Sequence, residues 1–354
     1  FSALSFFTDT PELRLFGDGN TWQSIVGASA LLWIVHFLIL RGVQTAASIN
    51  LVATLAKLLP LGLFVVLAMM MFKLDTFKLD FTGLALGVPV WEQVKNTMLI
   101  TLWVFIGVEG AVVVSARARN KRDVGKATLL AVLSALGVYL LVTLLSLGVV
   151  ARPELAEIRN PSMAGLMVEM MGPWGEIIIA AGLIVSVCGA YLSWTIMAAE
   201  VPFLAATHKA FPRIFARQNA QAAPSASLWL TNICVQICLV LIWLTGSDYN
   251  TLLTIASEMI LVPYFLVGAF LLKIATRPLH KAVGVGACIY GLWLLYASGP
   301  MHLLLSVVLY APGLLVFLYA RKTHTHDNVL NRQEMVLIGM LLIASVPATW
   351  MLVG

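Results

Sequence analysis

Apolar runs of about 20 residues, separated by short polar loops, are the feature that most constrains this chain. A run of that length crosses a bilayer as a helix, because a helix satisfies its backbone hydrogen bonds within one segment. Hydrophobic residues make up 60% of the 354 residues and charged residues only 11%, where soluble domains carry about 25% charged residues. The sequence therefore predicts an all-α polytopic membrane protein.

About ten transmembrane helices can be traced, and the distribution of basic residues supports their boundaries. With the loop at 8–20 placed outside, 15 of the 22 Lys and Arg residues fall in loops assigned to the inside, six in loops assigned to the outside and one, Lys57, within a span. Positive charge favours the cytoplasmic side of a membrane protein. The predicted spans are Trp22–Leu40, Ala46–Phe72, Val94–Ala116, Val124–Val150, Glu176–Ala206, Ser225–Thr245, Leu252–Ile274, Ala282–Ala297, Met301–Ala320 and Met335–Val353.

The third span carries an acidic residue between two glycines, Gly107-Val-Glu109-Gly110. A carboxylate inside an apolar segment is costly, which makes it a candidate functional residue. Glycine weakens a helix, and backbone exposed at membrane depth is tolerated only where it lines a cavity or meets a ligand. Discontinuous helices of this kind hold substrates in many transporters. The segment predicts a broken helix at a substrate site.

The same segment resembles the sixth span of the amino acid–polyamine–organocation transporters. The resemblance is carried by Phe105, Gly107 and Glu109, followed by Ser115 and the Asn120–Arg122 stretch. Within that superfamily the chain is most similar to the basic amino acid/polyamine antiporter group, in particular to its arginine/ornithine antiporters. The resemblance extends over essentially the whole chain.

The resemblance implies a LeuT-like fold of two inverted five-helix repeats. The chain begins with Phe1 inside an apolar tail, so we expect a fragment that lacks the first three helices of that fold. Residues 22–72 are then the remnant of the first repeat, residues 94–274 the second repeat, and residues 282–354 additional C-terminal helices, all in one transmembrane domain.

The resemblance also assigns substrate-binding roles around the predicted break. Trp103 would close over the substrate as an aromatic gate, although an interfacial or packing tryptophan is the alternative. Backbone groups of Ile106, Gly107 and Val108 would receive the α-ammonium of the substrate. Glu109 has three possible roles: it faces a cationic substrate, holds the broken helix by hydrogen bonding, or exchanges a proton.

Four further residues within the spans are candidates for recognition or coupling. Trp194 resembles a tryptophan that contacts the substrate side chain in arginine exchangers, and a flat indole suits a guanidinium; core packing is the alternative. Lys57 is either a proton carrier or a fixed positive charge. Glu258 departs from the mostly apolar tenth span of the family and would add negative charge for a dibasic substrate. His36 is interpreted as a hydrogen-bonded helix histidine, with a proton relay as the alternative.

These features favour secondary active transport of cationic amino acids, most simply arginine/ornithine exchange across a bacterial inner membrane. Proton-coupled uptake by a symporter is the alternative within transport. An intramembrane enzyme would need a nucleophile and base or a metal set, and a scaffold or sensor would not transport at all. The sequence shows no nucleotide-binding motif, catalytic nucleophile set or metal cluster. We therefore expect no catalytic residues, cofactor, metal or nucleic-acid partner; the expected partners are a small-molecule substrate, membrane lipids and a second copy in a homodimer.

Overall fold

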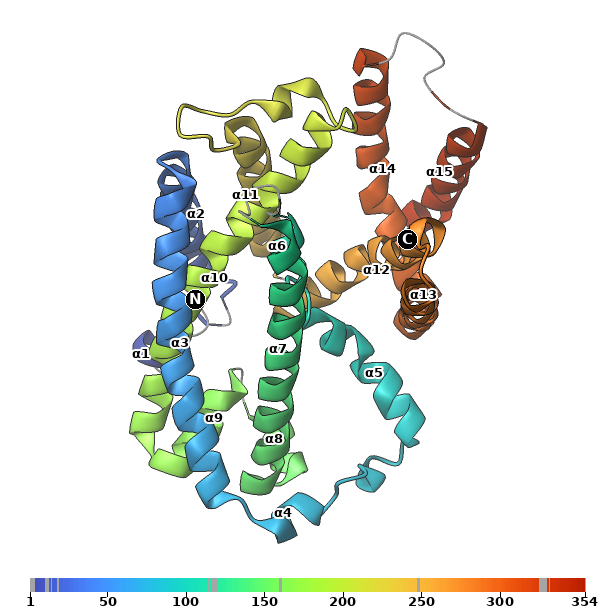
Figure 1. The fold of residues 1–354 in the computed structure, drawn as a ribbon. Helices are drawn as coiled ribbons and strands as arrows, with labels where there is room; N and C mark the ends of the chain where they lie inside the picture. The colour runs from blue at the N-terminus through green and yellow to red at the C-terminus, as the bar shows by residue number, and fades with distance from the viewer. Residues whose placement is uncertain are drawn as a thin grey trace. The chain divides into compact units, whose positions relative to one another are not determined.

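In the computed structural model, the described residues are 4–9, 13, 15–17, 19–113, 115, 120–158, 161–246, 249–324, 330 and 332–353, and all of their regular structure is helical (Figure 1). The chain forms two compact units, each assembled from separate segments. Unit 1 contains Phe1–Val88, Gly107–Leu204 and Ile214–Asp248, and unit 2 contains Pro89–Ile106, Ala205–Arg213 and Tyr249–Gly354. The basic residues Arg14, Arg117, Arg119 and Arg159 lie outside the described residues.

Unit 1 holds the helices of the first half of the chain other than α5, together with α11 and all of α10 except its last three residues. They are α1 (Ser5–Thr8), α2 (Trp22–Leu40), α3 (Val43–Met71), α4 (Leu74–Lys78), α6 (Gly110–Val113), α7 (Lys121–Val149), α8 (Arg152–Glu157), α9 (Ser162–Met171), α10 (Pro173–Thr207) and α11 (Ser225–Thr245), with 3₁₀ turns η1 (Leu84–Leu86) and η3 (Arg213–Ala216). The η3 turn begins in unit 2, with Arg213, and continues into unit 1.

The long helix α10 takes part in both hydrophobic cores of unit 1. In one core, Ile179 of α10 packs with Phe64 of α3 and Met167 of α9. In the other, Leu192 packs with residues of α2 and α11 such as Ile39. Between these cores the ring of Pro60 in α3 lies against Gly182, where any side chain would collide with it. Small residues let helix backbones approach closely in membranes, where no hydrophobic force drives helices together.

Unit 2 holds α5 (Val90–Trp103), α12 (Tyr249–Ile274), α13 (Pro278–Ser298), α14 (Pro300–His324) and α15 (Arg332–Val353). Its central pair is α12 with α13, which run antiparallel. Three glycines mark their close contact: Gly268 against Ala287, Gly284 against Leu272 and Gly291 against Phe265. The N-terminal part of α5 joins this pair through Trp91 and Trp293, whose ring centroids lie 4.3 Å apart.

Pro263 lies inside α12 and removes one backbone donor from that helix. A proline cannot donate to the carbonyl four residues earlier, which is that of Met259. The hydroxyl of Tyr310 on α14 donates to this carbonyl at 2.5 Å. A neighbouring helix thus supplies the missing donor, as is typical for prolines in membrane helices.

Six helical segments in the described part of the chain are long and apolar enough to cross a membrane. They are Trp22–Leu40, Asp123–Val149, Pro173–Thr207, Ser225–Thr245, Ala256–Ile274 and Pro278–Ser298. The other predicted spans lie on α3, on α5 with α6, on α14 and on α15, so the count of ten spans stays a prediction. Helix α9 was not predicted; its Ala164 and Met167 are completely buried in a core of unit 1.

Candidate functional site

The predicted third span is not one continuous helix. Helix α5 ends at Trp103, residues 104–109 form turns, and the short helix α6 begins at Gly110. The boundary between the two units falls inside this turn, after Ile106. Trp103 and Ile106, both half-buried, therefore belong to unit 2, whereas Gly107, Val108 and Glu109 belong to unit 1.

Glycine is required at position 107 by the backbone itself. Gly107 has a φ of +104°, a conformation that side chains other than glycine rarely adopt. Its N–H donates to Oε2 of Glu109 at 2.8 Å, so the carboxylate folds back over the turn that contains it. The carbonyls of Gly107 and Glu109 accept from Gly110 at 3.0 Å and from Val112 at 2.8 Å, which starts α6. The turn is thus held by the Glu109 side chain at one end and a helical start at the other.

Two side chains of α10 lie directly against this turn. The indole of Trp194 covers Gly107: a Cβ on that glycine would come within 2.7 Å of Cζ2. One helical turn later, Met197 covers Gly110, where a Cβ would come within 2.6 Å of Sδ. The structure therefore brings together Gly107, Glu109 and Trp194, three of the residues predicted for the substrate site. Met197 was not predicted, and only its spacing of three residues from Trp194 could have indicated it.

The turn brings together two kinds of group that attract cations. Trp194 remains 43% exposed although one part of its ring packs on Gly107. An open aromatic face attracts guanidinium and ammonium groups. Glu109 is half-buried, and its carboxylate accepts from the N–H of Gly107, the glycine that Trp194 covers. In unit 1, a negative group and an aromatic surface thus lie next to irregular backbone.

The two predicted coupling residues lie on different helices. Lys57 is half-buried on α3, one turn before Pro60. Glu258 is buried on α12 of unit 2, with an exposure of 5%, and directly precedes Met259, whose carbonyl binds Tyr310. The assignment of Lys57 and Glu258 to coupling stays a prediction.

His36 belongs to a polar ladder between α2 and α11. Its Nδ1 lies 2.9 Å from Nδ2 of Asn232, and the imidazole is completely buried beside the ring of Trp229. A second rung joins Gln236 to Ser29 at 2.9 Å and to Trp33 at 3.2 Å. The interpretation of His36 as a hydrogen-bonded helix histidine is confirmed. Asn232 and Gln236, polar residues in an apolar run, were the sequence signal for the ladder.

These features define a class: a polytopic helical membrane protein with a discontinuous helix whose turn meets an aromatic and an acidic side chain. The amino acid permease family model matches residues 1–342. The chain belongs to this family.

Three curated relatives of the chain are named antiporters. An arginine/ornithine antiporter of Pseudomonas aeruginosa is 44% identical over 341 residues, which cover 91% of this chain and 70% of that protein. An arginine/agmatine antiporter of Chlamydia caviae is 41% identical, with 88% of this chain and 68% of that protein covered. An arginine/agmatine antiporter of Chlamydia pneumoniae is 38% identical, with 94% and 73% covered.

Proposed function

We propose that this protein exchanges cationic amino acids across a bacterial inner membrane, with arginine and ornithine as the first pair to test. The names of its relatives are the observation that carries the proposal, since all three relatives described above exchange arginine for another cation. The apolar helices and the permease family agree with a multi-pass membrane protein. Exchange between substrates of similar charge needs no energy source other than their gradients.

In this proposal the turn after α5 is the substrate site. Ile106, Gly107 and Val108 present backbone groups to the α-ammonium, Trp194 stacks on the substrate side chain, and Trp103 closes over it. The open indole face and the neighbouring carboxylate support this assignment. The ten-span, inverted-repeat arrangement, the coupling roles of Lys57 and Glu258, and the homodimer are further parts of the proposal.

The first experiment measures uptake of labelled arginine into vesicles that contain the full-length transporter, with and without ornithine inside. We expect uptake to require internal ornithine. Uptake that ignores internal ornithine and follows an imposed pH gradient would refute exchange and favour a symporter. Trp194→Ala should abolish uptake, whereas Trp243→Ala, which removes a 51% exposed tryptophan of α11, should not.

Two substitutions at Glu109 separate its possible roles. Glutamine keeps an oxygen that can accept from the Gly107 N–H but carries no charge, and alanine loses both. If Glu109 only holds the turn, Glu109→Gln should transport and Glu109→Ala should not. If its charge or its proton is needed, both should fail. Glu169→Ala, at an exposed glutamate of α9, is the matched control.

A further inference from the structure

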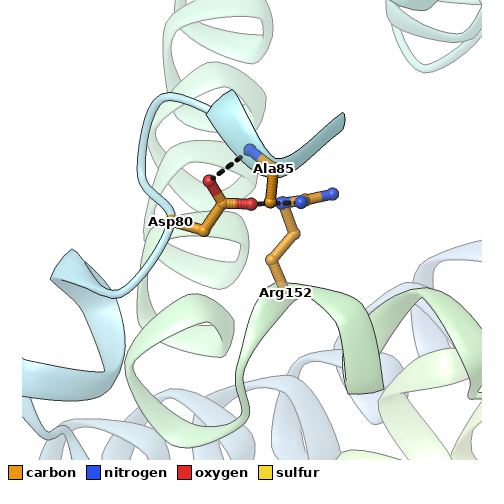
Figure 2. A network of polar contacts seen from close by, with 3 residues as sticks. All are labelled: Asp80, Ala85 and Arg152. Atoms are coloured by element: carbon orange, nitrogen blue, oxygen red, sulfur yellow. Dashed lines mark hydrogen bonds and ion pairs between the residues drawn. The ribbon is translucent and has the colours of Figure 1, made fainter. Parts of the chain in front are cut away.

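An ion pair joins the loop that leads into the broken span to the segment that follows α7. Asp80 lies between α4 and η1, and Arg152 is the first residue of α8 (Figure 2). Arg152 Nε donates to Asp80 Oδ2 at 2.8 Å, and Nη2 donates to the same oxygen. The side chains are only 10% (Asp80) and 27% (Arg152) exposed, which makes the pair better shielded than an ordinary surface ion pair.

The two oxygens of Asp80 have separate partners. Oδ1 accepts from the backbone N–H of Ala85 at 3.3 Å, which fixes the start of the η1 turn, and Oδ2 receives the guanidinium (Figure 2). The Arg152 guanidinium holds the pKa of the Asp80 carboxyl below its ordinary value, so the pair stays charged at neutral pH. One side chain thus both shapes the loop and attaches it to α8.

A second attachment lies nearby. The N–H of Lys73 donates to the carbonyl of Gly148 at 2.9 Å, and the ring of Phe72 lies against Gly148, where any side chain would collide with it. The end of α3 is therefore fixed to the end of α7, and Asp80 is fixed to α8 seven residues further along the loop. Only residues 81–89 then separate the attached point from the first residue of α5.

We propose that Asp80 and Arg152 are positioning residues for transport: they form a staple that anchors the loop through which the chain continues into α5. The inference rests on the proposed function, because α5 leads to the turn assigned to the substrate. A loop released from the staple samples more positions, so a smaller fraction of the protein has a binding-competent turn. The apparent dissociation constant rises as that fraction falls. Breaking the staple should therefore raise the KM for external arginine by roughly fivefold, the upper range for a partly exposed ion pair.

The test uses the isosteric variant Asp80→Asn, in which the remaining oxygen still accepts from Ala85 while the charge is lost. Arg152→Gln removes the other partner, and the double variant closes the cycle. Asp75→Asn, at an exposed aspartate of α4 in the same loop, is the control. We expect the two single variants and the double variant to raise KM to a similar extent at an unchanged maximal rate, with no effect of Asp75→Asn.

Amide hydrogen exchange of the peptide 79–88 in the full-length protein provides a readout that does not depend on transport. We expect faster exchange than in the wild type for Asp80→Asn, Arg152→Gln and the double variant. The exchange rate of the Asp75→Asn control should be unchanged. Slow exchange in all variants, an unchanged KM, or additive effects in the double variant would each overturn the staple. If the wild type transports no arginine, the proposed function fails, whereas the exchange measurement still decides whether the staple fixes the loop.

Discussion

Removing one oxygen atom, with Tyr310→Phe, tests how α12 tolerates its internal proline. The hydroxyl of Tyr310 lies 2.5 Å from the Met259 carbonyl, which Pro263 leaves without its helical donor. A buried carbonyl left without a donor costs about 1–3 kcal/mol. Hydrogen bonds between membrane helices average about 0.6 kcal/mol, with a maximum of about 1.7. We therefore expect Tyr310→Phe to lower the free energy of unfolding by about 1 kcal/mol.

The same substitution in a Pro263→Ala background gives the decisive comparison. Alanine restores an N–H that can donate to the Met259 carbonyl, so Tyr310→Phe should then cost close to nothing. Equilibrium unfolding in mixed micelles measures all four corners of this cycle. Tyr319→Phe is the control, because Tyr319 lies on the same helix and is 61% exposed. An equal cost of Tyr310→Phe in both backgrounds would refute the idea that Tyr310 substitutes for the missing donor.

Three further predictions follow from contacts of unit 1. Asn232→Leu leaves Nδ1 of the buried His36 without its hydrogen-bond partner and should destabilise the protein by roughly 1 kcal/mol in the same unfolding assay. Adding His36→Phe should recover most of that lost stability. A double variant less stable than Asn232→Leu would contradict this. Gly107→Ala forces a side chain into a φ of +104° and against an indole, so ornithine-dependent uptake should be lost, while Gly125→Ala, where a Cβ would have open space, should transport normally. The lowered pKa of Asp80 means that its ion pair stabilises the loop above the ordinary pKa of an aspartate, 3.8, and is lost only as the pH falls through the lower value of the folded protein. Slow hydrogen exchange of residues 79–88, corrected for the intrinsic pH dependence, should therefore persist as the pH falls below 3.8. Loss of protection with a midpoint at or above 3.8 would show that the pKa of Asp80 is not lowered.

The helices were predictable because their causes are local. The predicted bounds of Trp22–Leu40 and Ser225–Thr245 coincide with α2 and α11. An apolar run that must satisfy its own backbone in a membrane has essentially one regular solution. The interruption near Gly107 was also visible, because glycine weakens a helix whatever surrounds it.

The contacts between helices were not predictable in the same way. The sequence marks His36 as a polar residue in an apolar run, but its partner Asn232 lies 196 residues away. The sequence likewise marks Pro263 as a helix breaker but does not show that Tyr310 repairs the break. Asp80 and Arg152 lie between predicted spans, and nothing in the spacing of the residues around them indicates that the two side chains pair.

By itself, the sequence determined the membrane environment, most helix positions and the place where one helix opens, since these depend on the hydropathy and backbone freedom of consecutive residues. Only the tertiary structure decided that Trp194 and Met197 cover the opened turn, that Glu109 turns back onto Gly107, and that Asp80 meets Arg152. Those outcomes depend on the direction and distance at which separate segments pack. Many pairings of apolar helices bury similar surfaces, and close packing with satisfied polar groups selects one of them.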